Sequence, residues 1–155
     1  MRPEQGRRSR RVADWTARLH AVIEAASVRP FAWGAHDCCV FAADCVRAIT
    51  GSDPMAELRG AYDDARGAAR LLAERDLRGR LLDALGYPIP VALAQRGDVV
   101  IVTHLRIVRE GVVLLDETAE GREAAGICLG EKSAFAAESG LAMLPTLACA
   151  AAWRV

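Results

Sequence analysis

The chain has 155 residues, a formal net charge of zero and 52% apolar residues. One core of this size buries most of the apolar surface that the unfolded chain exposes, so a single domain is sufficient. The apolar content excludes a disordered chain. The balanced charge gives no general attraction to polyanions, so we expect neither a nucleic-acid partner nor a membrane surface.

Charge is uneven only at the N-terminus. Glu4 is the single acid among the first eleven residues, which carry five arginines: Arg2, Arg7, Arg8, Arg10 and Arg11. We expect residues 1–12 to form a flexible basic arm and residues 13–155 to form one domain. Contact between this arm and phosphate groups is the alternative use of its charge.

The basic arm does not resemble a signal peptide. The segment that follows it is interrupted by the polar residues Asp14, Arg18, His20 and Glu24. An apolar signal core is therefore not expected, and no stretch of the chain reaches the length of a membrane span. These features predict synthesis in the cytoplasm and no membrane association. The odd number of cysteines then favours free thiols over a disulfide framework.

The first half of the chain predicts helices. Residues 14–27 carry apolar side chains at helical spacing, with Asp14 as a candidate N-cap. A second helix is expected to start at Asp37 or Cys38 and to end at Gly51, a C-terminal cap. "SDPMAELRG" predicts a short turn of helix. Leucines at helical intervals in "DDARGAARLLAER" and "LRGRLLDALG" predict two further helices.

The second half of the chain predicts strands. From Gly97 onward, short β-branched or apolar runs such as "GDVVIVTHLRIV" and "GVVLLDE" are separated by Gly and polar turns. The final "AAWRV" is a candidate edge strand. Helices first and strands second indicate an α+β domain in which N-terminal helices pack on a C-terminal antiparallel sheet.

Residues 33–46, "WGAHDCCVFAADCV", contain one histidine and three of the five cysteines. Imidazole and thiolate are good zinc ligands. However, adjacent cysteines such as Cys38 and Cys39 should point to different sides of a helix, and the gap to Cys45 is not a knuckle spacing. We therefore expect no metal and no other cofactor. Cys45 and Cys128 are interpreted as small buried apolar residues.

Cys38 differs from the other cysteines because it falls in the first turn of the expected helix. The positive end of the helix dipole and the unpaired backbone N–H groups there stabilise a thiolate. The same N–H groups can donate to an oxyanion. Cys38 is therefore a candidate nucleophile, and a purely structural cysteine is the alternative.

Three segments resemble the NlpC-type papain-like cysteine peptidases: Asp37-Cys38 at a helix start, "GDVV" from Gly97 and "GICLG" from Gly126. Further segments, "PFAWGAHDC", "FAADCVRAITGSDP", "LRGAY", "RGDVV" and "AAWRV", resemble an uncharacterised branch of that superfamily found among phage and prophage tail genes. The resemblance implies a papain-like, NlpC-type architecture for the single domain.

The resemblance also implies a catalytic arrangement. Cys38 falls in the position of the nucleophile, and Ala124 falls in the position of the histidine that acts as general base. A cysteine peptidase needs an imidazole near its thiol, so another histidine would have to replace it. His104 is the first candidate and His36 the second, whereas His20 is expected at the surface. Asp98 could orient such a base or form a turn.

Two functions follow from the resemblance. The first is a cysteine hydrolase of murein peptide or amide bonds, with Cys38 as nucleophile and His104 as base. The alternative is a catalytically inactive tail or tail-assembly protein that uses the papain-like fold to bind other proteins. The corresponding partners are a murein peptide or phage tail proteins, and the virion tail would then be the destination of the protein.

Overall fold

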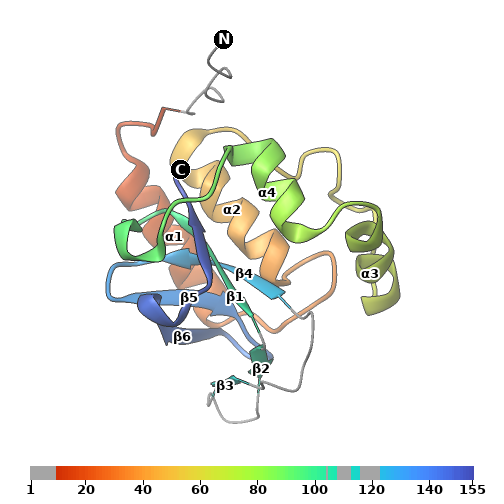
Figure 1. The fold of residues 1–155 in the computed structure, drawn as a ribbon. Helices are drawn as coiled ribbons and strands as arrows, with labels where there is room; N and C mark the ends of the chain where they lie inside the picture. The colour runs from red at the N-terminus through yellow and green to blue at the C-terminus, as the bar shows by residue number, and fades with distance from the viewer. Residues whose placement is uncertain (1–9, 104, 108–112, 116–122) are drawn as a thin grey trace.

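The computed structural model describes residues 10–103, 105–107, 113–115 and 123–155. Four helices come first along the chain (Figure 1): α1 (Trp15–Ser27), α2 (Cys38–Thr50), α3 (Ala65–Glu74) and α4 (Leu77–Leu85). Two short 3-10 helices lie among the later segments: η1 (Val91–Leu93) and η2 (Thr146–Ala148). None of the helices in the described ranges is long and apolar enough to cross a bilayer.

The strands form an antiparallel sheet in the order β6-β5-β4-β1-β7. Their bounds are β1 (Val99–Thr103), β4 (Glu123–Cys128), β5 (Lys132–Ala136), β6 (Leu141–Pro145) and β7 (Ala151–Trp153). A separate hairpin joins β2 (Leu105–Ile107) to β3 (Val113–Leu115). Strand β7 lies at one edge beside β1, as "AAWRV" predicted.

The helices lie together on one side of the sheet, with α2 packed across β4 and β5 (Figure 1). The core on this side joins apolar side chains of α1, α2 and α4 to one face of the sheet: Leu19, Phe41, Cys45, Ile49, Leu77, Ile101 and Ile127 among others. The opposite face of the sheet is covered near η1, where Ile89 and Val91 pack on Val100 and Val102. The α+β prediction is therefore confirmed.

The ends of α2 agree with the sequence prediction, whereas the start of α1 agrees only in part. Asp37 caps α2 with its side chain, and Gly51 ends it in a left-handed conformation at φ 80°. Asp14 precedes α1 but makes no capping bond, because its carboxylate binds the Arg18 guanidinium at 2.9 Å. Residues 54–60 form consecutive turns, and the Arg59 backbone N–H donates to the Met55 carbonyl oxygen at 3.0 Å across one turn of helix, as "SDPMAELRG" predicted.

Asp98 fixes both ends of the described chain. Its carboxylate has no exposed surface and forms ion pairs with Arg11 at 3.1 Å and with Arg154 at 3.0 Å. It also accepts hydrogen bonds from the backbone N–H groups of Gln95 and Val155. Of the two roles considered for Asp98, this geometry supports the structural one. Arg11, which the sequence analysis assigned to the flexible basic arm of residues 1–12, is instead held on the domain by these contacts.

Candidate functional site

The site begins with Asp37, which is buried at the N-terminus of α2. One carboxylate oxygen accepts the backbone N–H of Val40 at 2.8 Å. The other oxygen accepts the backbone N–H of Gly34 at 2.9 Å and the hydroxyl of Tyr62. This carboxylate therefore holds the first turn of α2, and with it Cys38, in one position.

The "LRGAY" segment, for which the sequence suggested no chemistry, secures this helix start. The backbone of Tyr62 passes so close to Gly34 that a Cβ there would lie 2.0 Å from the Tyr62 carbonyl oxygen. Arg59 forms ion pairs with Asp53 at 2.6 Å and with Asp44 of α2 at 2.7 Å. The segment acts as a strap over the N-terminal half of α2, and we call residues 53–62 the strap below.

Cys38 is half-buried against the first half of β4. Strand β4 pairs with β5 only at Ile127 and Cys128, so its earlier residues are not paired on that side. The backbone N–H of Ala125 donates to the Cys38 sulfur. The Cys38 thiol therefore lies at the start of α2, beside backbone groups of β4 that β5 does not pair with.

The sulfur atoms of Cys38 and Cys39 lie 3.9 Å apart. The two thiols are therefore in contact, although Cys39 packs against the helix-side core and Cys38 against the cluster on the opposite face of the sheet. The Cys39 thiol, acting as hydrogen-bond donor, lowers the pKa of Cys38, and the Ala125 N–H lowers it further. The same contact and burial raise the pKa of Cys39. The pair thus favours a thiolate on Cys38 and a protonated thiol on Cys39.

The other cysteines are in different surroundings. Cys45, Cys128 and Cys149 are buried, which confirms the interpretation of Cys45 and Cys128 as apolar residues. Burial raises the pKa of Cys45 and raises that of Cys149 to about 11. Within the ranges that the structure describes, no group of three or more His, Cys, Asp and Glu residues could hold a metal ion.

The histidine position of the resembled family is filled by Ala124, which is buried in β4 on the sheet face that Cys38 contacts. His104 lies outside the described residues. Thr103, the residue before it, pairs with Glu123, the residue before Ala124.

The two histidines that the structure describes do not bind Cys38. His20 is exposed on α1 and lies 3.3 Å from Glu24, as a surface residue would. His36 is buried and lines a cavity formed by residues of α1 and α2. Its ring lies edge-on to Phe41, with centroids 6.1 Å apart. No hydrogen bond between described side chains joins either imidazole to the thiol.

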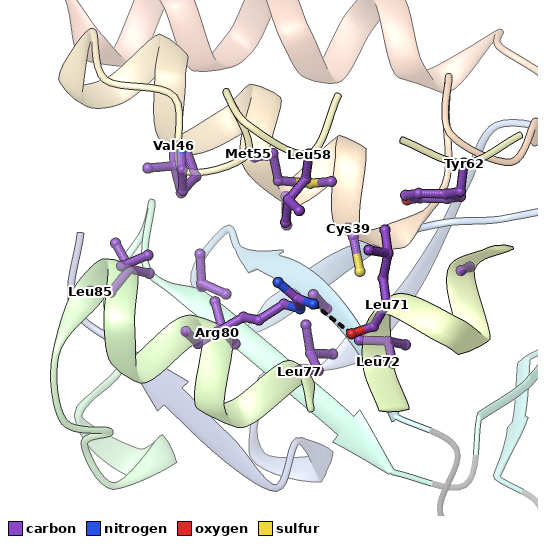
Figure 2. Close-up of a pocket in the computed structure, with 18 residues that line it drawn as sticks. Cys39, Val46, Met55, Leu58, Tyr62, Leu71, Leu72, Leu77, Arg80 and Leu85 are labelled. Atoms are coloured by element: carbon purple, nitrogen blue, oxygen red, sulfur yellow. Dashed lines mark hydrogen bonds between the residues drawn. The ribbon is translucent and has the colours of Figure 1, made fainter. Parts of the chain in front are cut away.

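A cavity of about 90 Å³ opens beside Cys39 (Figure 2). Its walls are mostly apolar and come from α2, α3, α4 and the strap: Ala42, Ala43, Val46, Met55, Leu58, Leu71, Leu72, Leu77, Leu81 and Leu85 among others. Arg80 is the one charged side chain among the lining residues that the structure describes, and it donates to the carbonyl oxygen of Leu71. A cavity of about 150 Å³ holds benzene, so this smaller one suits a short aliphatic group.

The three tryptophans lie in the core or at its rim. Trp153 is buried, and Trp15 packs against the core with the Arg11 guanidinium 4.3 Å above its ring. Trp33 is partly exposed and meets Phe31 edge-on at 4.9 Å. None of the three lines the cavity beside Cys39.

The profile of one protein family, described as a domain of unknown function (DUF6950), matches residues 10–155. The chain therefore belongs to this family. No curated protein and no solved structure matches the chain.

Proposed function

We propose that this protein is a cysteine hydrolase of peptide or amide bonds, with Cys38 as its nucleophile. The observation that carries the proposal is the Cys38 thiol in the first turn of α2, with a pKa lowered by Cys39 and by the Ala125 N–H. A thiolate is the nucleophilic form of cysteine, and a helix N-terminus stabilises it. The NlpC-type resemblance, which places its nucleophile in the same position, supports the assignment.

The reaction would follow acyl transfer through the thiol. The Cys38 thiolate attacks the carbonyl carbon, and backbone N–H groups at the start of α2 donate to the oxyanion that forms. An imidazolium then protonates the leaving amine, and the neutral imidazole activates the water that hydrolyses the thioester. We assign the imidazole to His104, the histidine that the sequence analysis put first as a replacement for the family's base.

The cavity lined by Cys39, whose sulfur lies 3.9 Å from that of Cys38, suggests which substrate group is bound near the nucleophile. Its apolar walls and volume of about 90 Å³ suit a short aliphatic side chain. Alanine side chains in murein peptide stems belong to this class, so a murein peptide is the substrate that we propose. This assignment also agrees with the tail-gene branch that the sequence resembles.

A labelling and cleavage experiment tests the proposal. Iodoacetamide at pH 7 should alkylate Cys38 before the other cysteines, because its thiolate is favoured. Cys38→Ala and His104→Ala should each lower the cleavage of purified murein peptides by at least about 10²-fold, the effect expected when a nucleophile or base is removed. Peptide mapping by mass spectrometry and chromatography of the products measure the two effects.

Cys149→Ala serves as the matched control. Cys149 is a buried thiol whose pKa is raised to about 11, so its removal should leave both labelling and cleavage unchanged. Equal alkylation of all cysteines, together with no murein cleavage by the unmodified protein, would overturn the hydrolase proposal.

A second candidate function is favoured by Ala124. A buried methyl group fills the histidine position, and no hydrogen bond joins Cys38 to a histidine in the described part of the chain. We propose as the alternative an inactive tail-assembly protein that binds other tail proteins. It predicts co-purification with proteins of the neighbouring tail genes, undisturbed by Cys38→Ala. A strictly monomeric protein without partners, when expressed with those genes, would contradict it.

A further inference from the structure

A second cavity, of about 330 Å³, lies between α1 and α2. Small-molecule sites begin at about 300 Å³, so this volume is sufficient for a small ligand. Its walls combine apolar side chains with charged ones: Arg18, Val22, Ala25, Ala26, Arg29, His36, Phe41, Asp44, Arg47 and Ala48. Cys38 and Cys39 are not among these residues, so the cavity is separate from the site proposed above.

His36 contributes a buried polar atom to the wall of this cavity. The residue is 2% exposed, and its Nε2 atom has no hydrogen-bond partner among the described residues. A buried polar atom without a partner costs about 1–3 kcal/mol, so such atoms are rare in native proteins. Burial, together with the nearby Arg29, lowers the pKa of His36.

The charged residues of the cavity leave an excess of positive charge. Asp44, the one carboxylate in its wall, is bound to Arg59 at 2.7 Å. Arg18 is bound to Asp14 at 2.9 Å. Arg29 and Arg47 have no carboxylate partner within 4.0 Å in the described part of the chain.

We propose that this cavity binds a small organic anion. Its carboxylate or phosphate oxygens would accept hydrogen bonds from the guanidinium groups of Arg29 and Arg47, and the ligand would lie beside the His36 ring that lines the cavity. A short apolar portion of the ligand would lie against Val22 and Phe41. The proposal rests on none of the residues assigned to hydrolysis, so it holds whether or not the protein cleaves murein.

The test is a titration followed by NMR of the imidazole groups. Inorganic phosphate and butyrate, added separately at constant ionic strength and pH 7, probe the two oxyanion chemistries. With at least one of them, the His36 signals should shift saturably, whereas those of His20, exposed beside Glu24, should not. Saturation by phosphate alone or by butyrate alone would identify the anionic group of the ligand.

Three variants connect the shift to this cavity. Arg29→Gln and Arg47→Gln should each weaken binding by at least about tenfold, because each removes a charge-assisted hydrogen bond to the ligand. Arg70→Gln, which removes an exposed arginine of α3 outside the cavity, should leave the affinity unchanged. The absence of a saturable His36 shift with both anions would overturn the proposal. Equal affinities of all three variants and the unmodified protein would overturn it as well.

Discussion

At the scale of single residues, the hydrogen bond from Tyr62 to Asp37 has the clearest energetic consequence. Burial and the Asp37 carboxylate raise the pKa of Tyr62, so its hydroxyl keeps its proton and remains a donor at neutral pH. Asp37 is buried, and its oxygens also bind the start of α2. Loss of the tyrosine hydroxyl would therefore leave a buried carboxylate with one hydrogen bond fewer.

Tyr62→Phe should lower the free energy of unfolding by about 1.5–3 kcal/mol, the range for a hydrogen bond to a charged group. Urea denaturation measures this change. Tyr87→Phe is the matched control, because Tyr87 is 77% exposed and the same substitution there should be nearly neutral. Equal stability of the two variants would show that the Tyr62 hydroxyl does not support the helix start.

The residues of the site differ in how far a single sequence could predict them. Cys38 and Asp37 were found because a helix start has local signals in the sequence. The partnership of Asp37 with Tyr62 was missed because it joins residues 25 positions apart and no short motif encodes it. The closeness of the Cys38 and Cys39 sulfurs was also missed, since it depends on how the first turn of α2 meets β4.

At the scale of elements, the strap depends on two glycines with similar backbone conformations. Gly34 has φ 74° and Gly60 has φ 77°, both in the left-handed region that favours glycine. Only Gly34 is crowded, because the Tyr62 carbonyl oxygen occupies the place of a Cβ, whereas nothing lies within 4 Å of a Cβ at Gly60. Substitution at Gly60 therefore tests the cost of the left-handed conformation alone. Substitution at Gly34 tests the same cost together with the cost of close packing.

Gly60→Ala should lower the free energy of unfolding by about 1–2 kcal/mol, because a residue with a Cβ is disfavoured in the left-handed conformation. Gly34→Ala should lower the free energy of unfolding by more, because the strap would also have to move away from the start of α2. Thermal and urea unfolding of both variants measure the difference. Equal destabilisation would indicate that the strap shifts freely and does not hold Cys38 in place.

The elements themselves were largely predictable. Helical spacing gave α1, α2, α3 and α4, and the β-branched runs gave the strands of the sheet. The short turn of helix in the strap was predictable, whereas the path of the rest of the strap was not, because the ion pairs of Arg59 and packing against Gly34 fix it. These contacts join residues that are far apart in the sequence, so the secondary-structure propensities of the residues do not predict them.

At the scale of the whole molecule, Asp98 connects the two ends of the described chain to the sheet. It is a fully buried carboxylate with two arginine partners, so its replacement affects several contacts at once. The α+β class was predictable from helices followed by strands. The role of Asp98 was not, because its partners lie 87 and 56 residues away along the chain.

Asp98→Asn should lower the free energy of unfolding by about 3 kcal/mol, as when one partner of a buried ion pair is removed. Asp83→Asn is the control, since the Asp83 side chain is 62% exposed and its pair with Arg75 should contribute less than about 1 kcal/mol. Chemical denaturation of both variants compares them. A similar, small loss in each would mean that the Asp98 ion pairs do not tie the ends of the domain together.

Arg11 also donates to the carbonyl oxygen of Val155 at 2.9 Å, although the two residues are 144 positions apart. The two ends of the described chain therefore meet at one point on the surface of the domain. Chain ends that lie this close together are compatible with circular permutation. We expect the contacts of the core to be preserved if a short linker joins these ends and new chain ends are created in a surface turn elsewhere.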